Sequence, residues 1–117
     1  MIVSPNMTVF EVIRGFSEEF PFLRLEIYCQ GQEATTVWLE KPLFALSRLK
    51  EPLDVYLHAD MPVFEVVESF WQNMGLQVVI FRRVGNSWLE TSFTGNWTLE
   101  HQNNMGSAMV SVWSSGT

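Results

Sequence analysis

Cysteine is almost absent from this chain of 117 residues, which contains only Cys29. One cysteine cannot form a disulfide within the chain, and it cannot supply the Cys-x-x-Cys spacing of a metal site. The glycine-rich loop that cradles phosphates in nucleotide-binding proteins is also missing. We therefore expect a protein of the reducing cytoplasm, with neither a metal nor a cofactor.

Positive charge is scarce as well, because seven lysines and arginines face thirteen acidic residues and the formal net charge is −6. An acidic surface repels phosphate backbones and anionic lipids, so we expect no nucleic-acid partner and no membrane partner. No apolar stretch approaches the roughly 18 residues that a membrane span requires. With 47% hydrophobic residues, however, the chain can bury a substantial core.

The chain contains a short internal repeat. Five residues in six consecutive positions recur at an offset of 54, from position 7 to 61: Met7, Val9, Phe10, Glu11 and Val12, then Met61, Val63, Phe64, Glu65 and Val66. Phe16 and Gly31 return on the same offset as Phe70 and Gly85. Self-similarity of this kind indicates a duplicated structural unit.

Each copy predicts a strand, a helix and two further strands. In the first copy the strands are 2–4, 22–29 and 34–39, and Thr8 with Glu11 forms a capping box at the start of the helix. In the second copy the strands are 53–58, 76–83 and 87–93, and the helix runs from about Asp60 to Gly75. We expect a single domain over 1–105, built from repeats 1–40 and 55–94, each followed by a short helix or turn, and a C-terminal tail over 106–117.

Two β-α-β-β units in tandem predict an α+β fold with two helices on one face of a single mixed or antiparallel sheet of about six strands. This arrangement is similar to the ferredoxin-like sandwich, with one extra hairpin strand in each half. A duplicated unit of this kind also resembles the effector-binding domains of some bacterial transcription regulators, in topology alone. A ubiquitin-like grasp is an alternative that fits less well, because only one short strand precedes Thr8.

The repeat predicts which side chains lie on each face of the sheet. If Leu23, Leu25 and Ile27 face the helices, the offset places Gln77, Val79 and Phe81 there too. The opposite face then carries a set of apolar residues: Ile2, Tyr56, Leu76, Val78 and Ile80. A large apolar face of this kind is usually covered. Three alternatives could cover it: a second copy of the chain, a small apolar ligand, or the C-terminal region with Trp97, Leu99, Met105 and Met109.

Phe10, Phe64 and Trp71 lie off the apolar stripes of the two helices. We expect the helices to touch side by side through these aromatic residues. The alternative is an exposed anchor for a partner protein.

Few residues are candidates for chemistry. His58 follows the second opening strand and His101 lies in a polar segment, 94–104, and either could act as a general base. That segment is a recognition element in one interpretation, with Trp97 as its apolar anchor and Glu100, His101, Gln102 and Asn103 as hydrogen-bonding groups. In the other interpretation it is a turn and a solvated short helix with Thr98 as N-cap.

We therefore predict a non-catalytic binding module, for a protein partner or a small apolar ligand, and a homodimer through the sheet face as one arrangement of it. The alternative is a small cofactor-independent enzyme with an apolar cavity and a histidine base. No catalytic or metal-binding residue is predicted. The candidate ligand- or partner-binding residues are Tyr56, His58, Val78, Ile80, Trp97, Glu100, His101, Gln102 and Asn103.

Overall fold

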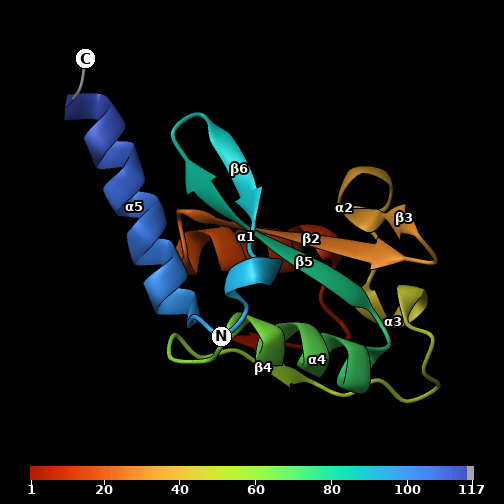
Figure 1. The fold of residues 1–117 in the computed structure, drawn as a ribbon. Helices are drawn as coiled ribbons and strands as arrows, with labels where there is room; N and C mark the ends of the chain where they lie inside the picture. Colours follow the sequence, from red (N-terminus) through yellow and green to blue (C-terminus); the bar gives the residue numbers. More distant parts are fainter. Residues whose placement is uncertain (116–117) are drawn as a thin grey trace.

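The fold is α+β (Figure 1). The predicted strand 34–39 is wrong, because Ala34–Val37 form a short helix and the strand that pairs with the end of Leu23–Cys29 is Gln32–Glu33. The computed structural model describes residues 1–115, and the side-chain surroundings of residues 1–108. In chain order the elements are β1 (Ile2–Val3), α1 (Val9–Glu19), β2 (Leu23–Cys29), β3 (Gln32–Glu33), α2 (Ala34–Val37), α3 (Leu43–Leu46), β4 (Val55–Tyr56), α4 (Val63–Met74), β5 (Gln77–Val84), β6 (Ser87–Glu90), the 3-10 helix η1 (Ser92–Thr94) and α5 (Leu99–Ser115).

The strands form two antiparallel sheets, so the prediction of a single six-stranded sheet is wrong. One sheet has the order β3-β2-β5-β6, and β1 pairs with β4 in a separate two-stranded sheet. The reason lies in the long strands, because β2 and β5 pair directly with each other over six residues. Their outer edges are taken by β3 and β6. The two-residue opening strands therefore have no place in that sheet and pair with each other.

The second long strand presents the face opposite to the predicted one. Leu25 lies directly across from Ile80, and Ile27 from Val78. Side chains directly opposite each other in an antiparallel pair share a face. Val78 and Ile80 are therefore buried on the helix face, and their predicted place on the far face is wrong.

This error comes from a helix–strand connection that is one residue shorter in the second copy. Phe16 and Phe70 keep the offset of 54, whereas the matching strand positions Leu23 and Leu76 are 53 apart. A shift of one residue turns every side chain of a strand to the other face. Gly75 permits the shorter connection, because it ends α4 in the left-handed conformation with φ of 62°.

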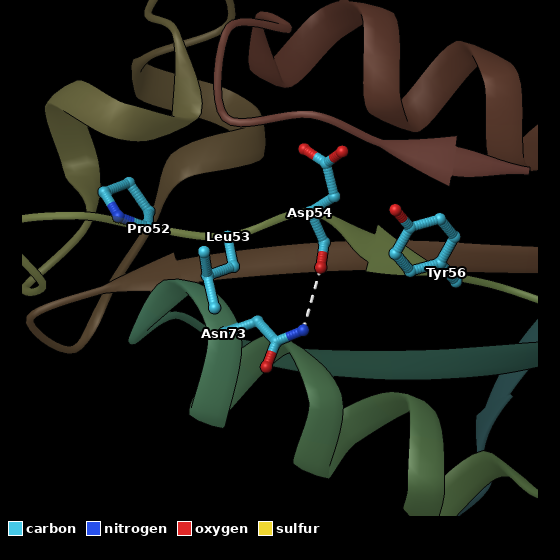
Figure 2. Close-up of a pocket in the computed structure, with 5 residues that line it drawn as sticks. All are labelled: Pro52, Leu53, Asp54, Tyr56 and Asn73. Atoms are coloured by element: carbon cyan, nitrogen blue, oxygen red, sulfur yellow. Dashed lines mark hydrogen bonds between the residues drawn. The ribbon is translucent and has the colours of Figure 1, made fainter.

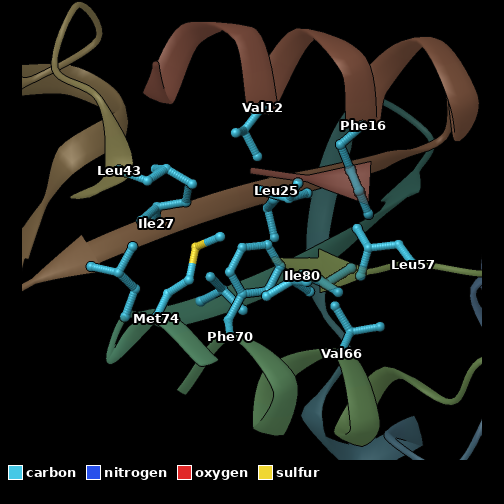
Figure 3. Close-up of a cluster of buried hydrophobic side chains, with 14 of the residues drawn as sticks. Val12, Phe16, Leu25, Ile27, Leu43, Leu57, Val66, Phe70, Met74 and Ile80 are labelled. Atoms are coloured by element: carbon cyan, nitrogen blue, oxygen red, sulfur yellow. The ribbon is translucent and has the colours of Figure 1, made fainter. Parts of the chain in front are cut away.

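The core lies between the helices and the two sheets, and apolar stripes of α1 and α4 fill it from two sides (Figure 3). Val12 and Phe16 of α1 meet Leu25 of β2, while Val66 and Phe70 enter from α4 (Figure 3). Thr8 starts α1 with a complete capping box, since its hydroxyl accepts from the Glu11 N–H and the Glu11 carboxylate accepts from the Thr8 N–H. The predicted capping box is confirmed.

The same backbone hydrogen bonds hold the start of both long helices to a later segment. In each copy the first helical N–H donates to a carbonyl of that segment, and an N–H of the segment donates back to the carbonyl two residues before the helix. The bonds are Val9 N–H to Lys41 O and Leu43 N–H to Met7 O in the first copy, and Val63 N–H to Trp97 O and Leu99 N–H to Met61 O in the second. Leu43 and Leu99 are both fully buried.

The C-terminal helix α5 runs from Leu99 to Ser115, so the predicted tail is wrong for residues 106–115. The helix starts with Thr98, whose hydroxyl accepts from the His101 N–H. Gly106 does not interrupt it and instead allows a close approach, since a Cβ there would lie 2.8 Å from the Cβ of Phe22. Residues 116–117 of the predicted tail, and the side chain of Met109, lie outside the described residues.

Candidate functional site

The two-stranded sheet carries an exposed apolar pair. Ile2 lies directly opposite Tyr56, and 57% of Ile2 and 54% of Tyr56 are exposed. The prediction that both lie on an outer face is confirmed. Tyr56 also lines an open hollow of about 430 Å³, together with Pro52, Leu53, Asp54 and Asn73 (Figure 2).

Two hydrogen bonds tie the wall of this hollow to the end of α4. The Leu53 N–H donates to the Asn73 carbonyl at 2.7 Å, and the Asn73 side-chain amide donates to the Asp54 carbonyl at 2.8 Å. The Asp54 carboxylate extends from the other side of the strand, away from Asn73 (Figure 2). Within the described residues it has no ion-pair or hydrogen-bond partner.

A second hollow region runs between α4 and β5. Two adjoining depressions of about 320 and 220 Å³ share Val67 and Gln77. They are lined by Val63, Val67 and Trp71 of α4, by Gln77, Val78, Val79 and Ile80 of β5, and by Glu90, Thr91 and Ser92. We call this region the α4 groove. Val78 and Ile80 belong to its floor, but each is at most 2% exposed.

Trp71 lines the α4 groove, and two further exposed aromatic residues belong to α4 and η1, the elements that border it. Phe93 in η1 is completely exposed, and Phe64 and Trp71 of α4 are each about half exposed. The Phe64 N–H donates to the Gly95 carbonyl at 2.9 Å, which holds the η1 segment at the start of α4. Phe10 of α1 is also nearly half exposed, so the expected contact between the helices through these aromatic residues is wrong.

Acidic residues accompany this surface. Glu65 and Glu68 are exposed on α4, and Glu90 closes one end of the groove. None of them is in an ion pair within the described residues. At the other end the guanidinium of Arg48 lies over the Trp71 ring, 5.5 Å from its centroid.

The predicted recognition segment holds α5 to the rest of the fold. Gln102 is fully buried; its amide donates to the Thr94 carbonyl and hydroxyl, and its oxygen accepts from Arg82 at 2.9 Å. The Asn103 oxygen accepts from the Phe22 N–H at 2.8 Å. Both ends of the Gln102 amide and the oxygen of the Asn103 amide are therefore engaged within the chain.

The other predicted residues of that segment are Trp97, Glu100 and His101. Trp97 is partly buried between the guanidinium of Arg82, 5.3 Å from its ring, and the imidazole of His101, 4.6 Å away. Glu100 and His101 are exposed. Because Arg82 is on the helix face of β5, the described part of α5 packs on that face and does not cover the opposite one.

The face of the four-stranded sheet opposite the helices mixes charged and aromatic groups. Arg24 pairs with Glu26 at 3.2 Å, and the Tyr28 hydroxyl donates to the same carboxylate at 2.8 Å. This hydrogen bond, with burial and the negative charges of Glu26 and Glu33, raises the pKa of Tyr28 to about 12. The expected apolar face is therefore confined to the two-stranded sheet.

The histidines lie apart from the hollows. His58 is exposed after β4, and neither it nor His101 lines the hollow beside Tyr56 or the α4 groove. Among the residues that the structure describes, no three His, Cys, Asp or Glu side chains are grouped closely enough to hold a metal ion. No helix in the described part of the chain is long and apolar enough to cross a membrane.

Several residues of these surfaces were not among the predicted ones, and Leu53, Asp54 and Phe93 are the most exposed or the most polar of those used below. The sequence pattern around Phe93 indicates an exposed aromatic residue in a turn, because a large apolar residue lies between Ser92 and Thr94, two positions before a glycine. The predicted strand 87–93 ends at this residue. Asp54 offered no signal, since a single carboxylate beside a short strand is commonplace.

Comparison with known protein families, with curated proteins and with solved structures finds no match to this chain. The interpretation of its surfaces therefore depends on its own residues.

Proposed function

We propose that this chain is a non-catalytic binding module that contacts a partner protein through the α4 groove and the aromatic residues around it. The observation that carries the proposal is the exposure of three aromatic side chains, because Phe93 is completely exposed and Phe64 and Trp71 of α4 are each about half exposed. Large aromatic side chains clustered at a groove are typical of the centre of protein interfaces.

The energy available at this surface is adequate for binding. Full burial of an exposed phenylalanine contributes about 1.5–3 kcal/mol, and we take about half of that for each half-exposed aromatic. Phe93, Phe64 and Trp71 together then offer about 3–6 kcal/mol. The carboxylate of Glu90, which lines the groove, favours a partner with a basic residue at that end, because complementary charge guides association.

The finer description of the fold is part of the proposal. We propose that the chain arose as a tandem duplication of a β-α-β-β unit related to the ferredoxin-like sandwich. The recurring hydrogen bonds at the start of α1 and α4 support it, as do the paired opening strands. A duplicated body whose second copy adds exposed aromatic residues is consistent with a binding role.

Site-specific photocrosslinking in the cells that make this protein tests the proposal. A photoreactive phenylalanine analogue replaces Phe93 in one variant and the half-exposed Phe44 of α3 in a matched control. We expect a defined adduct from position 93 that the control does not give, and its loss when Phe64→Ser is added. Equal adducts at both positions, or none at position 93, would contradict the proposal.

The adduct also identifies the kind of partner. An adduct with twice the mass of the chain indicates a homodimer through the α4 groove, in place of the sheet face predicted from the sequence, and any other mass indicates a different protein. Small-ligand binding and the alternative enzyme with a histidine base stay predictions. The positions of His58 and His101 count against the enzyme, because both residues are exposed and neither lines the hollow beside Tyr56 or the α4 groove.

A further inference from the structure

The hollow beside Tyr56 lies on a different side of α4 from the groove. Asn73, which bounds the hollow, follows Trp71 by two residues, and residues two apart on a helix point in nearly opposite directions. The hollow can therefore be occupied independently of the α4 groove.

Asp54 and Tyr56 both line this hollow, with the Asp54 carboxylate on the side of the strand away from Asn73. Asp54 comes directly before β4 and Tyr56 is the second residue of that strand, so at strand spacing their side chains lie on the same outer face. Figure 2 shows the Asp54 carboxylate and the Tyr56 hydroxyl on the same side of the strand. A carboxylate next to an aromatic ring attracts a cation through both its charge and the electrons of the ring.

The chain itself supplies no cation to Asp54. The ion pairs of the described residues involve Glu18, Glu19 and Glu26, and none involves Asp54. The net charge of −6 adds a general attraction for positively charged ligands.

Two of the three remaining lining residues are apolar, and the third is Asn73. Pro52 and Leu53 line the hollow, and 64% of Leu53 is exposed. A long side chain with an aliphatic stem and a charged end matches this combination, because the stem covers Leu53 while the charge reaches Asp54.

We propose that this hollow binds a lysine or arginine side chain presented by an extended peptide segment of a partner. A peptide is favoured over a free amine because Ile2, opposite Tyr56, extends the exposed apolar surface beyond the hollow. Neighbouring apolar residues of the peptide cover Ile2, whereas a free amine leaves it in water.

The test compares two synthetic peptides that differ in one charge, acetyl-Leu-Lys-Leu-amide and the same peptide with norleucine in place of lysine. Binding to the full chain is followed by NMR, through the backbone amides of residues 53–56 and Asn73. We expect the lysine peptide to bind about fivefold more tightly at low salt, the factor that one exposed charge pair with a cation–π contact supplies. High salt should reduce the difference.

Two variants and a third ligand complete the design. Asp54→Asn should remove the preference for lysine, while Asp60→Asn, which alters another exposed aspartate, should preserve it. Equal binding of the two peptides, or an unchanged preference in Asp54→Asn, would overturn the cation site. Butylammonium binding as tightly as the lysine peptide would overturn the choice of a peptide. None of these results bears on crosslinking at Phe93, so the two proposals fail separately.

Discussion

Gln102 is the side chain whose removal should damage the fold most for its size. It is fully buried, and replacing it with alanine deletes two hydrogen bonds to Thr94 and one from the Arg82 guanidinium. The Arg82 Nε is already buried without a partner among the described residues. Gln102→Ala therefore leaves that guanidinium with little besides its contact to the Trp97 ring.

The loss in the free energy of unfolding can be estimated from the hydrogen bonds that Gln102→Ala removes. A neutral hydrogen bond contributes about 0.5–1.5 kcal/mol net, and one to a charged group about 1.5–3 kcal/mol. With partial overlap between the two bonds to Thr94, we expect Gln102→Ala to lower the free energy of unfolding by about 3–4 kcal/mol. Because the network joins α5 to β5, part of the loss should appear as local release of α5.

Urea denaturation followed by circular dichroism measures the change, and Asn104→Ala, an exposed amide on the same helix, is the control. The double variant Arg82→Met with Gln102→Leu should recover most of the loss, because both partners become apolar together. A cost below about 1 kcal/mol for Gln102→Ala, within the range of one neutral hydrogen bond, would refute this reasoning.

Three further predictions concern single residues. The pKa of Tyr28 is raised to about 12 chiefly by its hydrogen bond to Glu26, so the contribution of this bond to folding stability is present below pH 10 and is lost as the pH rises toward 12. Glu26→Gln should lower the pKa of Tyr28 in a tyrosinate absorbance titration, and an unchanged titration would argue against the bond. Gly75→Ala should cost about 1–2 kcal/mol in urea denaturation because φ there is 62°, and a neutral effect would mean that the connection relaxes. Gly106→Ala should loosen α5, since its Cβ would meet Phe22 at 2.8 Å, and amide exchange in α5 as slow as in the parent chain would show that the helix does not need this close approach.

Much of the fold could be predicted from local patterns. The repeat located α1 and α4, and alternation located β2 and β5, because apolar spacing and capping residues are local signals. The connection between α4 and β5 could not be predicted in the same way. The repeated residues do not show how long the connection between helix and strand is in each copy. The connection is one residue shorter in the second copy, and this difference places Val78 and Ile80 on the opposite face from the predicted one.

The separate pairing of β1 with β4 also could not be predicted from local sequence patterns. Both strands are two residues long, and whether they join the main sheet depends on which edges the long strands leave open. In the candidate site, Tyr56 was predicted because its strand position is exposed by alternation. Gln102 was predicted as a surface group, since its amide gives no sign in the sequence that Thr94 and Arg82 would enclose it.

The exposure of residue 93 in the isolated protein tests the central claim most directly. A fluorinated phenylalanine at this position reports contact with water through its solvent isotope shift, and Phe16 in the core gives the buried reference. The account predicts the shift of a fully hydrated ring at position 93 down to the lowest measurable protein concentration. A ring as shielded as that of Phe16 at every dilution would show that this surface is already covered, and would contradict the account.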